Sequence, residues 1–392
     1  MRFHLGPYLA FAAFGVFWGT WGAALPALRD EAQLTEGQLG AALLCVGAGA
    51  LPAMLFTGRA VDRFGVRITG LLLLALAGSG ILLAWQATDP LSITIAMLLI
   101  GATSGASDVA ANALAALGEA RSHRRVITLS HAVFSSFVVA ASLGAGALRA
   151  AGHDVTFVFS VAGLLMAAAG AIVFIRGDGR PLSESPVAAT SGGGTARIWP
   201  FIAIGSVGAL GFAAENAHQS WSAIFLEDEL HVGLGFAALA PATFAAAAAI
   251  TRFTVGSSAR IPDRVLLIGG ATVASIGSVV VAFATSIPVA LMGLAFAAIG
   301  MSVLFPTLLS SSLRGVPDER RGRATSAIGA TAYLGFVFGP VYVGMLAGLI
   351  GLRGAMIGVA ALTAVFALAA PMARRLVTGS NQGHGLRRVG AS

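Results

Sequence analysis

Two acidic residues lie within long apolar stretches, where a charge needs a chemical reason. The first, Asp108, follows Gly101 and Gly105 and precedes Asn112 in the apolar run from about 91 to 117. These residues are spaced i, i+4, i+7 and i+11, so one helix face carries all four. An ionised Asp at a bilayer centre costs roughly 2.5–3.5 kcal/mol. We therefore expect a proton or solute site that includes Asp108 and Asn112; the alternative is a structural polar clamp between helices.

The second acidic residue, Glu215, belongs to a polar stretch between residues 211 and 222. Glu215, His218 and Ser222 share one helical stripe, and Asn216 and Gln219 flank it. So many polar groups in one apolar segment seldom face lipid. We expect Glu215 to bind either the proton or the solute, and Asn216, His218 and Gln219 to hydrogen-bond a hydroxylated solute.

A histidine supplies a third titratable group. His131 and Ser135 lie one helical turn apart in the run 126–149. Imidazole titrates near physiological pH, so we predict a coupled Asp108–His131 proton relay, with Ser135 contacting the solute. The alternative is a histidine hydrogen-bonded to a serine between helices.

Three tryptophans accompany these polar residues. Trp18, Trp21 and Trp221 offer stacking faces for a solute ring. The alternative is that they form the aromatic belt at the membrane interface.

The composition identifies the class of protein that must position these groups. The chain has 392 residues, of which 57% are hydrophobic and only 10% charged; a soluble domain is nearer 25% charged. We conclude that the chain is an all-α, multi-pass membrane protein. Its arginines recur in short clusters rather than in one patch, so we expect no nucleic-acid partner. The single Cys45 excludes an intrachain disulfide, and we expect no metal and no cofactor.

Hydropathy predicts twelve transmembrane helices. The first is too long for the apolar region of a signal peptide. The expected spans are residues 6–28, 38–57, 68–86, 91–117, 126–149, 155–175, 199–226, 234–253, 265–284, 287–313, 324–350 and 353–373.

The arginines orient these spans. If the N-terminus is cytoplasmic, all 24 except Arg29, Arg149 and Arg353 fall in cytoplasmic segments. The positive-inside rule therefore predicts that both termini are cytoplasmic and that the number of spans is even. Of the 17 acidic residues, only Asp108 and Glu215 lie inside spans.

A Gly- and Ser-rich segment divides the spans into two sets of six. We predict an N-terminal six-helix bundle (1–175), a cytoplasmic linker (176–198), a C-terminal six-helix bundle (199–376) and a cytoplasmic tail (377–392). A faint repeat supports this division, since Trp21 and Trp221 are each followed by a similar Gly-Leu-rich segment half a chain apart. Transporters use such repeated halves to build one central site.

The turn after the second span carries a family signature. It contains Gly58, Asp62, Arg63, Gly65 and Arg67. This spacing closely resembles the loop motif G-x-x-x-D-R-x-G-x-[RK] of the major facilitator superfamily. The resemblance covers essentially the whole chain and implies a fold of two six-helix bundles. It also implies that these five residues latch the halves together; at the end of span two, Gly58 would allow close helix approach.

Within that superfamily, the chain resembles the fucose-permease-like branch, including uncharacterised bacterial members. Gly105, Asp108 and Asn112 match its fourth-span pattern G-x-x-[DE]-x-x-x-N, which implies a proton-coupling role for Asp108. Related members have E-x-x-x-x-D-W-S in span seven, where this chain has Ser220 in place of the second acid. The coupling acid of span one and the motifs of drug–proton antiporters are also missing.

These patterns predict a secondary transporter, and not an enzyme, that works by alternating access. We expect proton-coupled symport of a small polar solute, with a sugar as one candidate; the alternative is a proton antiporter that exports drugs or metabolites. Short loops without clustered metal ligands exclude a membrane enzyme, and the lack of a P-loop excludes ATP as the energy source. The alternative from a different class is a non-transporting receptor or scaffold, which would tolerate loss of Asp108. We expect a monomer in the bacterial cytoplasmic (inner) membrane, whose partners are the lipid bilayer, protons and the solute.

Overall fold

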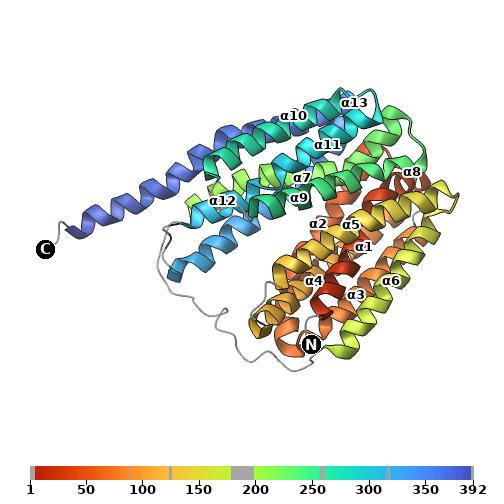
Figure 1. Cartoon of the computed structure of the whole chain (residues 1–392), viewed down its shortest axis with the longest axis horizontal. Helices are drawn as coiled ribbons and strands as arrows, with labels where there is room; N and C mark the ends of the chain where they lie inside the picture. Colours follow the sequence, from red (N-terminus) through yellow and green to blue (C-terminus); the bar gives the residue numbers. More distant parts are fainter. Residues whose placement is uncertain are drawn as a thin grey trace. The chain divides into compact units, whose positions relative to one another are not determined.

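The structure is a computed structural model that describes residues 5–86, 88–122, 126–177, 198–256, 261–314, 316 and 318–389. Every regular element in these residues is helical (Figure 1). Most of the predicted linker lies outside the described residues. The elements are α1 (Leu5–Glu31), α2 (Glu36–Phe64), α3 (Ile68–Gln86), α4 (Pro90–Ser122), α5 (Val126–Ala150), α6 (Val155–Arg176), α7 (Trp199–Leu230), α8 (Leu234–Ala237), α9 (Leu239–Gly256), the π-helix η2 (Val265–Gly269), α10 (Gly270–Ala282), α11 (Ile287–Met301), α12 (Leu304–Leu313) and α13 (Asp318–Val389).

Ten segments of the described chain are long and apolar enough to cross a membrane. One of them, Ala324–Ala373, contains 50 residues. Its helix, α13, is interrupted at Gly351, whose φ of 75° lies in the left-handed region that glycine adopts without strain. The helix α7 is not among the ten, because its central polar residues lower its hydropathy.

Two predicted spans are broken rather than continuous. The segment 234–253 begins with the short α8 before α9 starts. The segment 287–313 consists of α11 and α12, separated by a turn at Ser302 and Val303. The second break lies four residues before Pro306, which cannot donate a backbone hydrogen bond into the preceding turn.

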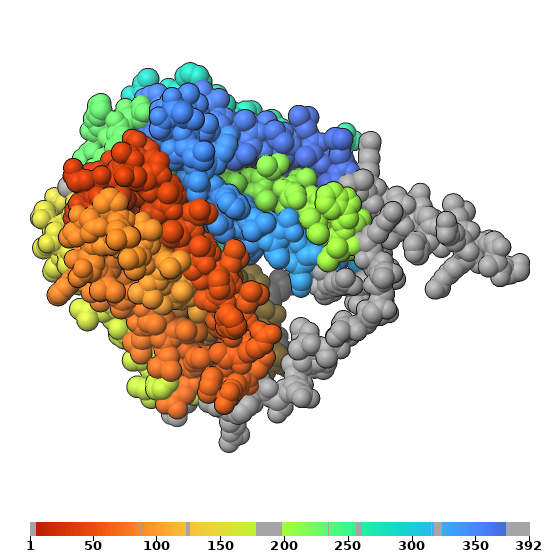
Figure 2. Space-filling view, turned by 180° about the vertical axis from the view of Figure 1, so that it is seen from behind, coloured from red at the N-terminus to blue at the C-terminus, as the bar shows by residue number. Residues whose placement is uncertain are grey.

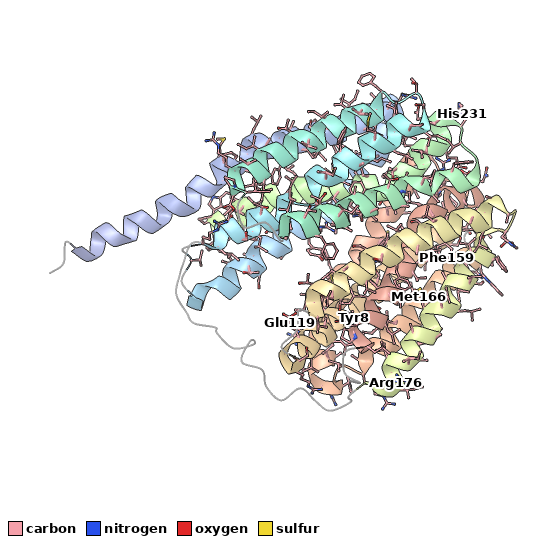
Figure 3. All side chains as sticks on the ribbon, viewed as in Figure 1. Tyr8, Glu119, Phe159, Met166, Arg176 and His231 are labelled. Carbon is pink, nitrogen blue, oxygen red and sulfur yellow. The ribbon has the colours of Figure 1, made fainter. Side chains whose placement is uncertain are left out.

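The chain folds into two compact units. Unit 1 contains Met1–Ala188, Gln219–Ala246 and Ala347–Leu349, and unit 2 contains Ala189–His218, Ala247–Leu346 and Ile350–Ser392. Within unit 1, Tyr8, Glu119 and Arg176 lie at one end and His231 at the other (Figure 3). The start of α1 and the ends of α4 and α6 therefore share one end of unit 1.

Glycines bring the helices of unit 1 into backbone contact. A Cβ at Gly101 of α4 would lie 1.9 Å from the Val46 carbonyl oxygen of α2, and one at Gly105 would lie 2.9 Å from the Ala50 Cα. A Cβ at Gly19 of α1 would likewise lie 2.3 Å from a carbonyl oxygen of α5. The residues coloured red to orange form one continuous part of the surface in Figure 2. The glycines Gly101 and Gly105 of α4 therefore admit a neighbouring helix, and that helix is α2.

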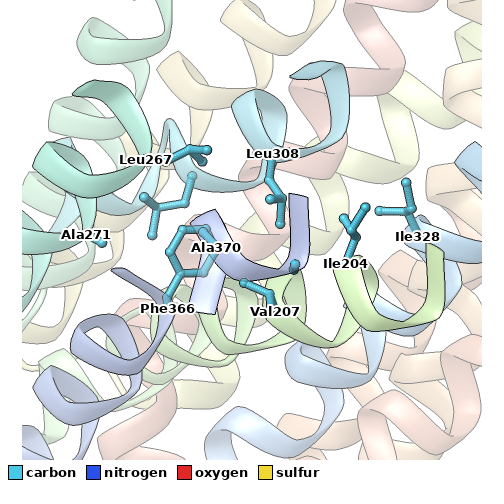
Figure 4. Close-up of a cluster of buried hydrophobic side chains, with 10 residues drawn as sticks. Ile204, Val207, Leu267, Ala271, Leu308, Ile328, Phe366 and Ala370 are labelled. Atoms are coloured by element: carbon cyan, nitrogen blue, oxygen red, sulfur yellow. The ribbon is translucent and has the colours of Figure 1, made fainter. Parts of the chain in front are cut away.

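The core of unit 2 is a cluster of aliphatic and aromatic side chains from five elements. Leu308 of α12 packs with residues of α7, η2, α10 and α13 (Figure 4). Because lipid tails are as apolar as these side chains, van der Waals packing between the helices holds the cluster together. This core positions the polar face of α7 described below. The buried members are Ile204, Val207, Leu267, Ala271, Leu304, Leu308, Ile328, Phe366, Ala370 and Ala373.

Candidate functional site

Asp108 lies on α4 with a neutral hydrogen-bond partner. The side-chain amide of Asn112 donates to the Asp108 carboxylate at 3.0 Å and to its backbone carbonyl at 2.9 Å. No ion pair to Asp108 is present among the described residues. The i, i+4 spacing in the sequence therefore produces a local Asp–Asn pair, in which nothing positive offsets the carboxylate.

The predicted relay partner His131 lies on α5 against α1. Its ring meets Phe11 edge to face, with centroids 4.8 Å apart. Ser135, one turn further along α5, is partly exposed. The helix α4 packs chiefly on α2 and α3, whereas α5 packs chiefly on α1. The Asp108–His131 relay stays a prediction.

Glu215 differs from Asp108 because it has a cationic partner. Arg252 of α9 donates from Nη2 to Glu215 Oε1 at 2.7 Å. The Glu215 side chain is only 8% exposed, whereas that of Arg252 is 47% exposed. This charge-assisted hydrogen bond offsets the cost of burying the carboxylate, and removing the arginine would strand a charge.

Arg252 and Asn216 also satisfy two backbone carbonyls that prolines leave without their usual donor. In a helix the carbonyl of residue i accepts from the N–H of residue i+4, and proline has no N–H. Pro306 thus frees the Ser302 carbonyl, which accepts from Arg252 Nε at 3.4 Å. Pro340 frees the Phe336 carbonyl, which accepts from the Asn216 side-chain amide.

An aromatic cluster lies within one helical turn of these bonds. Phe212 of α7 is 4.4 Å from Phe305, 5.6 Å from Tyr333 and 5.4 Å from Phe336, measured between ring centroids. Tyr333 is 38% exposed, so part of the cluster is open. We call Phe212, Phe305, Tyr333 and Phe336 the aromatic cluster. It provides ring faces beside the Glu215–Arg252 pair.

The other predicted contacts on α7 separate by burial. His218 is fully buried, and its Nε2 hydrogen-bonds the Ser278 hydroxyl of α10 at 2.9 Å. Gln219 is partly exposed. Trp221 is completely buried, so its ring presents no face to a solute in this conformation.

The other two predicted stacking residues, Trp18 and Trp21, lie on α1 beside Phe17. Trp18 meets Trp21 edge to face, with centroids 6.1 Å apart. Trp21 is 3% exposed, whereas Trp18 is partly exposed. Of the three predicted stacking residues, Trp18 alone therefore has an accessible ring in this conformation.

The charged turn after α2 has a defined local geometry. Gly65 ends α2 with a φ of 71°, which favours glycine, and its N–H donates to the Val61 carbonyl. Arg67 packs over the Phe174 ring at 3.9 Å and donates to the Phe174 carbonyl at 3.0 Å. At Gly58, by contrast, no described atom lies within 4 Å of the place a Cβ would occupy, so the close approach expected there is wrong for this conformation.

Arg63 and Asp62 of this turn are exposed. The Arg63 guanidinium lies 5.4 Å from the centroid of the neighbouring Phe64 ring. The latch role of the turn is not tested by these contacts and stays a prediction.

Sequence reasoning missed Arg252, which it had assigned only to a cytoplasmic positive cluster. Two signals pointed to it. A glutamate within a span needs a counterion, and Pro306 in a neighbouring span must free a carbonyl. Neither signal shows which helix faces α7.

Sequence comparison supplies the family. The sequence model of the Major Facilitator Superfamily matches residues 8–257 and 201–384. The chain belongs to the major facilitator superfamily. It is 28% identical to an uncharacterized MFS-type transporter of Yersinia pestis over 86% of this chain and 87% of that protein. It is also 28% identical to the uncharacterized transporter y4wD of Sinorhizobium fredii, over 96% of this chain and all of that protein. The chain is therefore a multi-pass membrane transporter and not an enzyme.

Solved structures share this fold. A bacterial homologue of the human lysosomal transporter Spinster superposes with a TM-score of 0.77 at 16% identity, over 96% of this chain and 97% of that chain. A D-xylose–proton symporter gives 0.76 at 15% identity, over 94% and 96% of the two chains. The Escherichia coli fucose:proton symporter gives 0.58 at 18% identity, over 95% and 99%. The superfamily recognised from the charged turn is confirmed, and a fucose symporter is among the structural neighbours.

Proposed function

We propose that this transporter couples proton movement to the uptake of a small polar solute by alternating access. The observation that carries the proposal is the contrast between the two acids within the spans. Asp108 has a neutral partner, Asn112, whereas Glu215 is paired with Arg252. An acid with no cation beside it can bind and release a proton without stranding a buried opposite charge. Asp108 is therefore the proton carrier, and the Glu215–Arg252 pair belongs to solute recognition.

The membrane arrangement follows the family fold. We propose twelve spans, in which α7 is the most polar span and α13 crosses twice, once on each side of Gly351. The spans form the N-terminal bundle (1–175) and the C-terminal bundle (199–376), both termini are cytoplasmic, and the protein is a monomer of the bacterial inner membrane. The proteins named as D-xylose–proton and fucose:proton symporters support symport and a sugar-like solute through shared fold alone.

The first experiment identifies a solute. The purified protein is screened for thermal stabilisation by sugars, organic acids and amphiphilic drugs at pH 6 and pH 8, because a ligand of the folded state raises its stability by RT ln(1 + [L]/Kd). Stabilisation by a polar solute supports the proposed solute class. Stabilisation by amphiphilic cations alone would replace symport with the antiporter alternative.

The second experiment tests coupling with that solute in proteoliposomes. Asp108→Asn should abolish uphill accumulation driven by a proton gradient while solute exchange continues, since the amide keeps the shape and loses the titratable group. Unchanged accumulation would remove Asp108 from the mechanism. His131→Ala tests the relay in the same assay: an unaltered pH profile would leave Asp108 as the carrier and exclude His131.

A further inference from the structure

We propose that Arg252 binds a carboxylate of the transported solute, and that a ring of the same solute packs on the aromatic cluster. The substrate class is thus a small cyclic carboxylate. This inference rests on the proposed transport function and specifies what is transported.

The Arg252 side chain is directed into the unit rather than toward the membrane interface. An arginine near the end of a span normally extends toward that interface. Arg252 lies three residues before the end of the span Gly235–Val255, yet its Nε and Nη2 bond Ser302 and Glu215. The guanidinium is therefore held inward by two hydrogen bonds.

The Nη1 side of the Arg252 guanidinium is available for a further acceptor. In the described part of the chain, no acceptor contacts either N–H of Arg252 Nη1. The side chain is 47% exposed although it lies within a span. A half-exposed charge at that position requires water or a polar ligand rather than lipid. A planar guanidinium can hold one carboxylate on each edge, so Arg252 can keep Glu215 and accept a second anion.

The charge balance of the site suits an anionic solute. Glu215 and Arg252 together carry no net charge. A bound carboxylate makes the set of three groups singly negative. Cotransport of that carboxylate with one proton moves no net charge across the membrane. A carboxylate solute therefore matches a symporter that moves one proton per solute.

The aromatic cluster lies where a ring attached to that carboxylate could reach it. Phe305 follows Ser302 by three residues, and Phe212 precedes Glu215 by three, so each ring lies one helical turn from a group that Arg252 contacts. Tyr333 leaves part of the aromatic cluster exposed. Aromatic faces stack on sugar and aromatic rings alike, which favours a carboxylate attached to a ring.

The test compares ring carboxylates with neutral analogues of the same ring. Thermal unfolding of the purified full chain is measured at pH 7 and constant ionic strength with glucuronate and glucose, quinate and myo-inositol, and benzoate and benzamide. At least one carboxylate should raise the midpoint while its neutral analogue does not. Equal or greater stabilisation by the neutral members would overturn the anion site and leave proton-coupled transport standing. No stabilisation by any carboxylate would overturn it as well.

Variants then assign the effect to Arg252. Arg252→Lys keeps the charge but loses the planar fork, so the carboxylate should bind about tenfold more weakly. Glu215→Gln removes the competing anion, so the carboxylate should bind more tightly. The double variant Glu215→Gln with Arg252→Gln leaves no buried unpaired charge and should lose the preference for the carboxylate over its neutral analogue.

A second ion pair of unit 2 provides the matched control. Arg314 pairs with Asp263 in the same unit, and neither residue belongs to the aromatic cluster. The double variant Asp263→Asn with Arg314→Gln should retain the carboxylate preference. If the Glu215–Arg252 double variant also retains it, Arg252 is not the anion site.

Discussion

Arg29 of α1 and Asp228 of α7 form an ion pair with two hydrogen bonds that joins the ends of two helices 199 positions apart in the chain. The Arg29 side chain is 11% exposed and that of Asp228 is 28% exposed. Arg29 also bonds its neighbour Asp30, which is 54% exposed. The pair lies within unit 1 and holds these two helix ends together.

We expect Asp228→Asn to lower the free energy of unfolding by about 1–3 kcal/mol, between the values for surface and buried pairs. Asp30→Asn is the matched control and should cost less, since Asp30 is more exposed. Both are measured by thermal unfolding in detergent. Equal losses for the two variants would contradict a specific role for Asp228.

The hydrogen bond from Asn216 to the Phe336 carbonyl, which Pro340 leaves without its usual donor, predicts that substitutions at Asn216 and Pro340 have non-additive effects on stability. Asn216→Ala removes the substitute donor to Phe336 and should destabilise the protein by about 1 kcal/mol. Pro340→Ala supplies the missing backbone N–H, so Asn216→Ala should cost less in that background. A double-mutant cycle measures the difference, and additive effects would show that Asn216 does not act through this carbonyl.

The contact between α4 and α2 predicts a steric effect at Gly101. A methyl group there would lie 1.9 Å from the Val46 carbonyl oxygen, so Gly101→Ala should destabilise the protein by about 1–3 kcal/mol through overpacking. Gly78 of α3 is the control, because no described atom lies within 4 Å of its Cβ position. Gly78→Ala should be neutral or slightly stabilising, since alanine favours helices. Similar thermal midpoints for the two variants would contradict the close approach.

At the start of α4, Asp89 caps the helix, and its contribution to the stability of the fold should depend on pH. Asp89 accepts from the backbone N–H groups of Leu91 and Ser92 at 2.9 and 3.0 Å. Hydrogen bonding by Ser92, first through its backbone, lowers the pKa of Asp89 below its usual value. The stabilisation by the carboxylate is therefore present above the unfolded-state pKa of about 3.9 and is lost as the pH falls through the lower folded-state pKa.

Asp89→Ala should accordingly lower the thermal midpoint at pH 7, and its effect should shrink as the pH falls through the lowered folded-state pKa of the wild-type carboxyl. Asp89→Asn keeps an acceptor oxygen and should retain part of the stabilisation over the same pH range. If Asp89→Ala lowered the thermal midpoint by the same amount at every pH, the Asp89 carboxylate would not be the source of this stabilisation.

Some features of the site were predictable because they are local along the chain. The alternation of apolar runs and arginine clusters identified a multi-pass membrane protein, and the spacing from Gly58 to Arg67 identified the superfamily. The i, i+4 spacing of Asp108 and Asn112 also produced the hydrogen bond that the structure contains. Helical periodicity is sufficient for such a pair because both residues belong to one element.

The sequence by itself thus determined that this chain is a helical membrane transporter, and it predicted Asp108 and Glu215 as the acids within the spans. Only the tertiary structure decided that Arg252 neutralises Glu215, that Asn216 caps a carbonyl freed by Pro340, and that Trp221 is buried. The physical reason is that hydropathy depends on the composition of each span alone. Partner choice depends on which face each helix turns toward its neighbours, and that rotation is set by packing between segments distant in the chain.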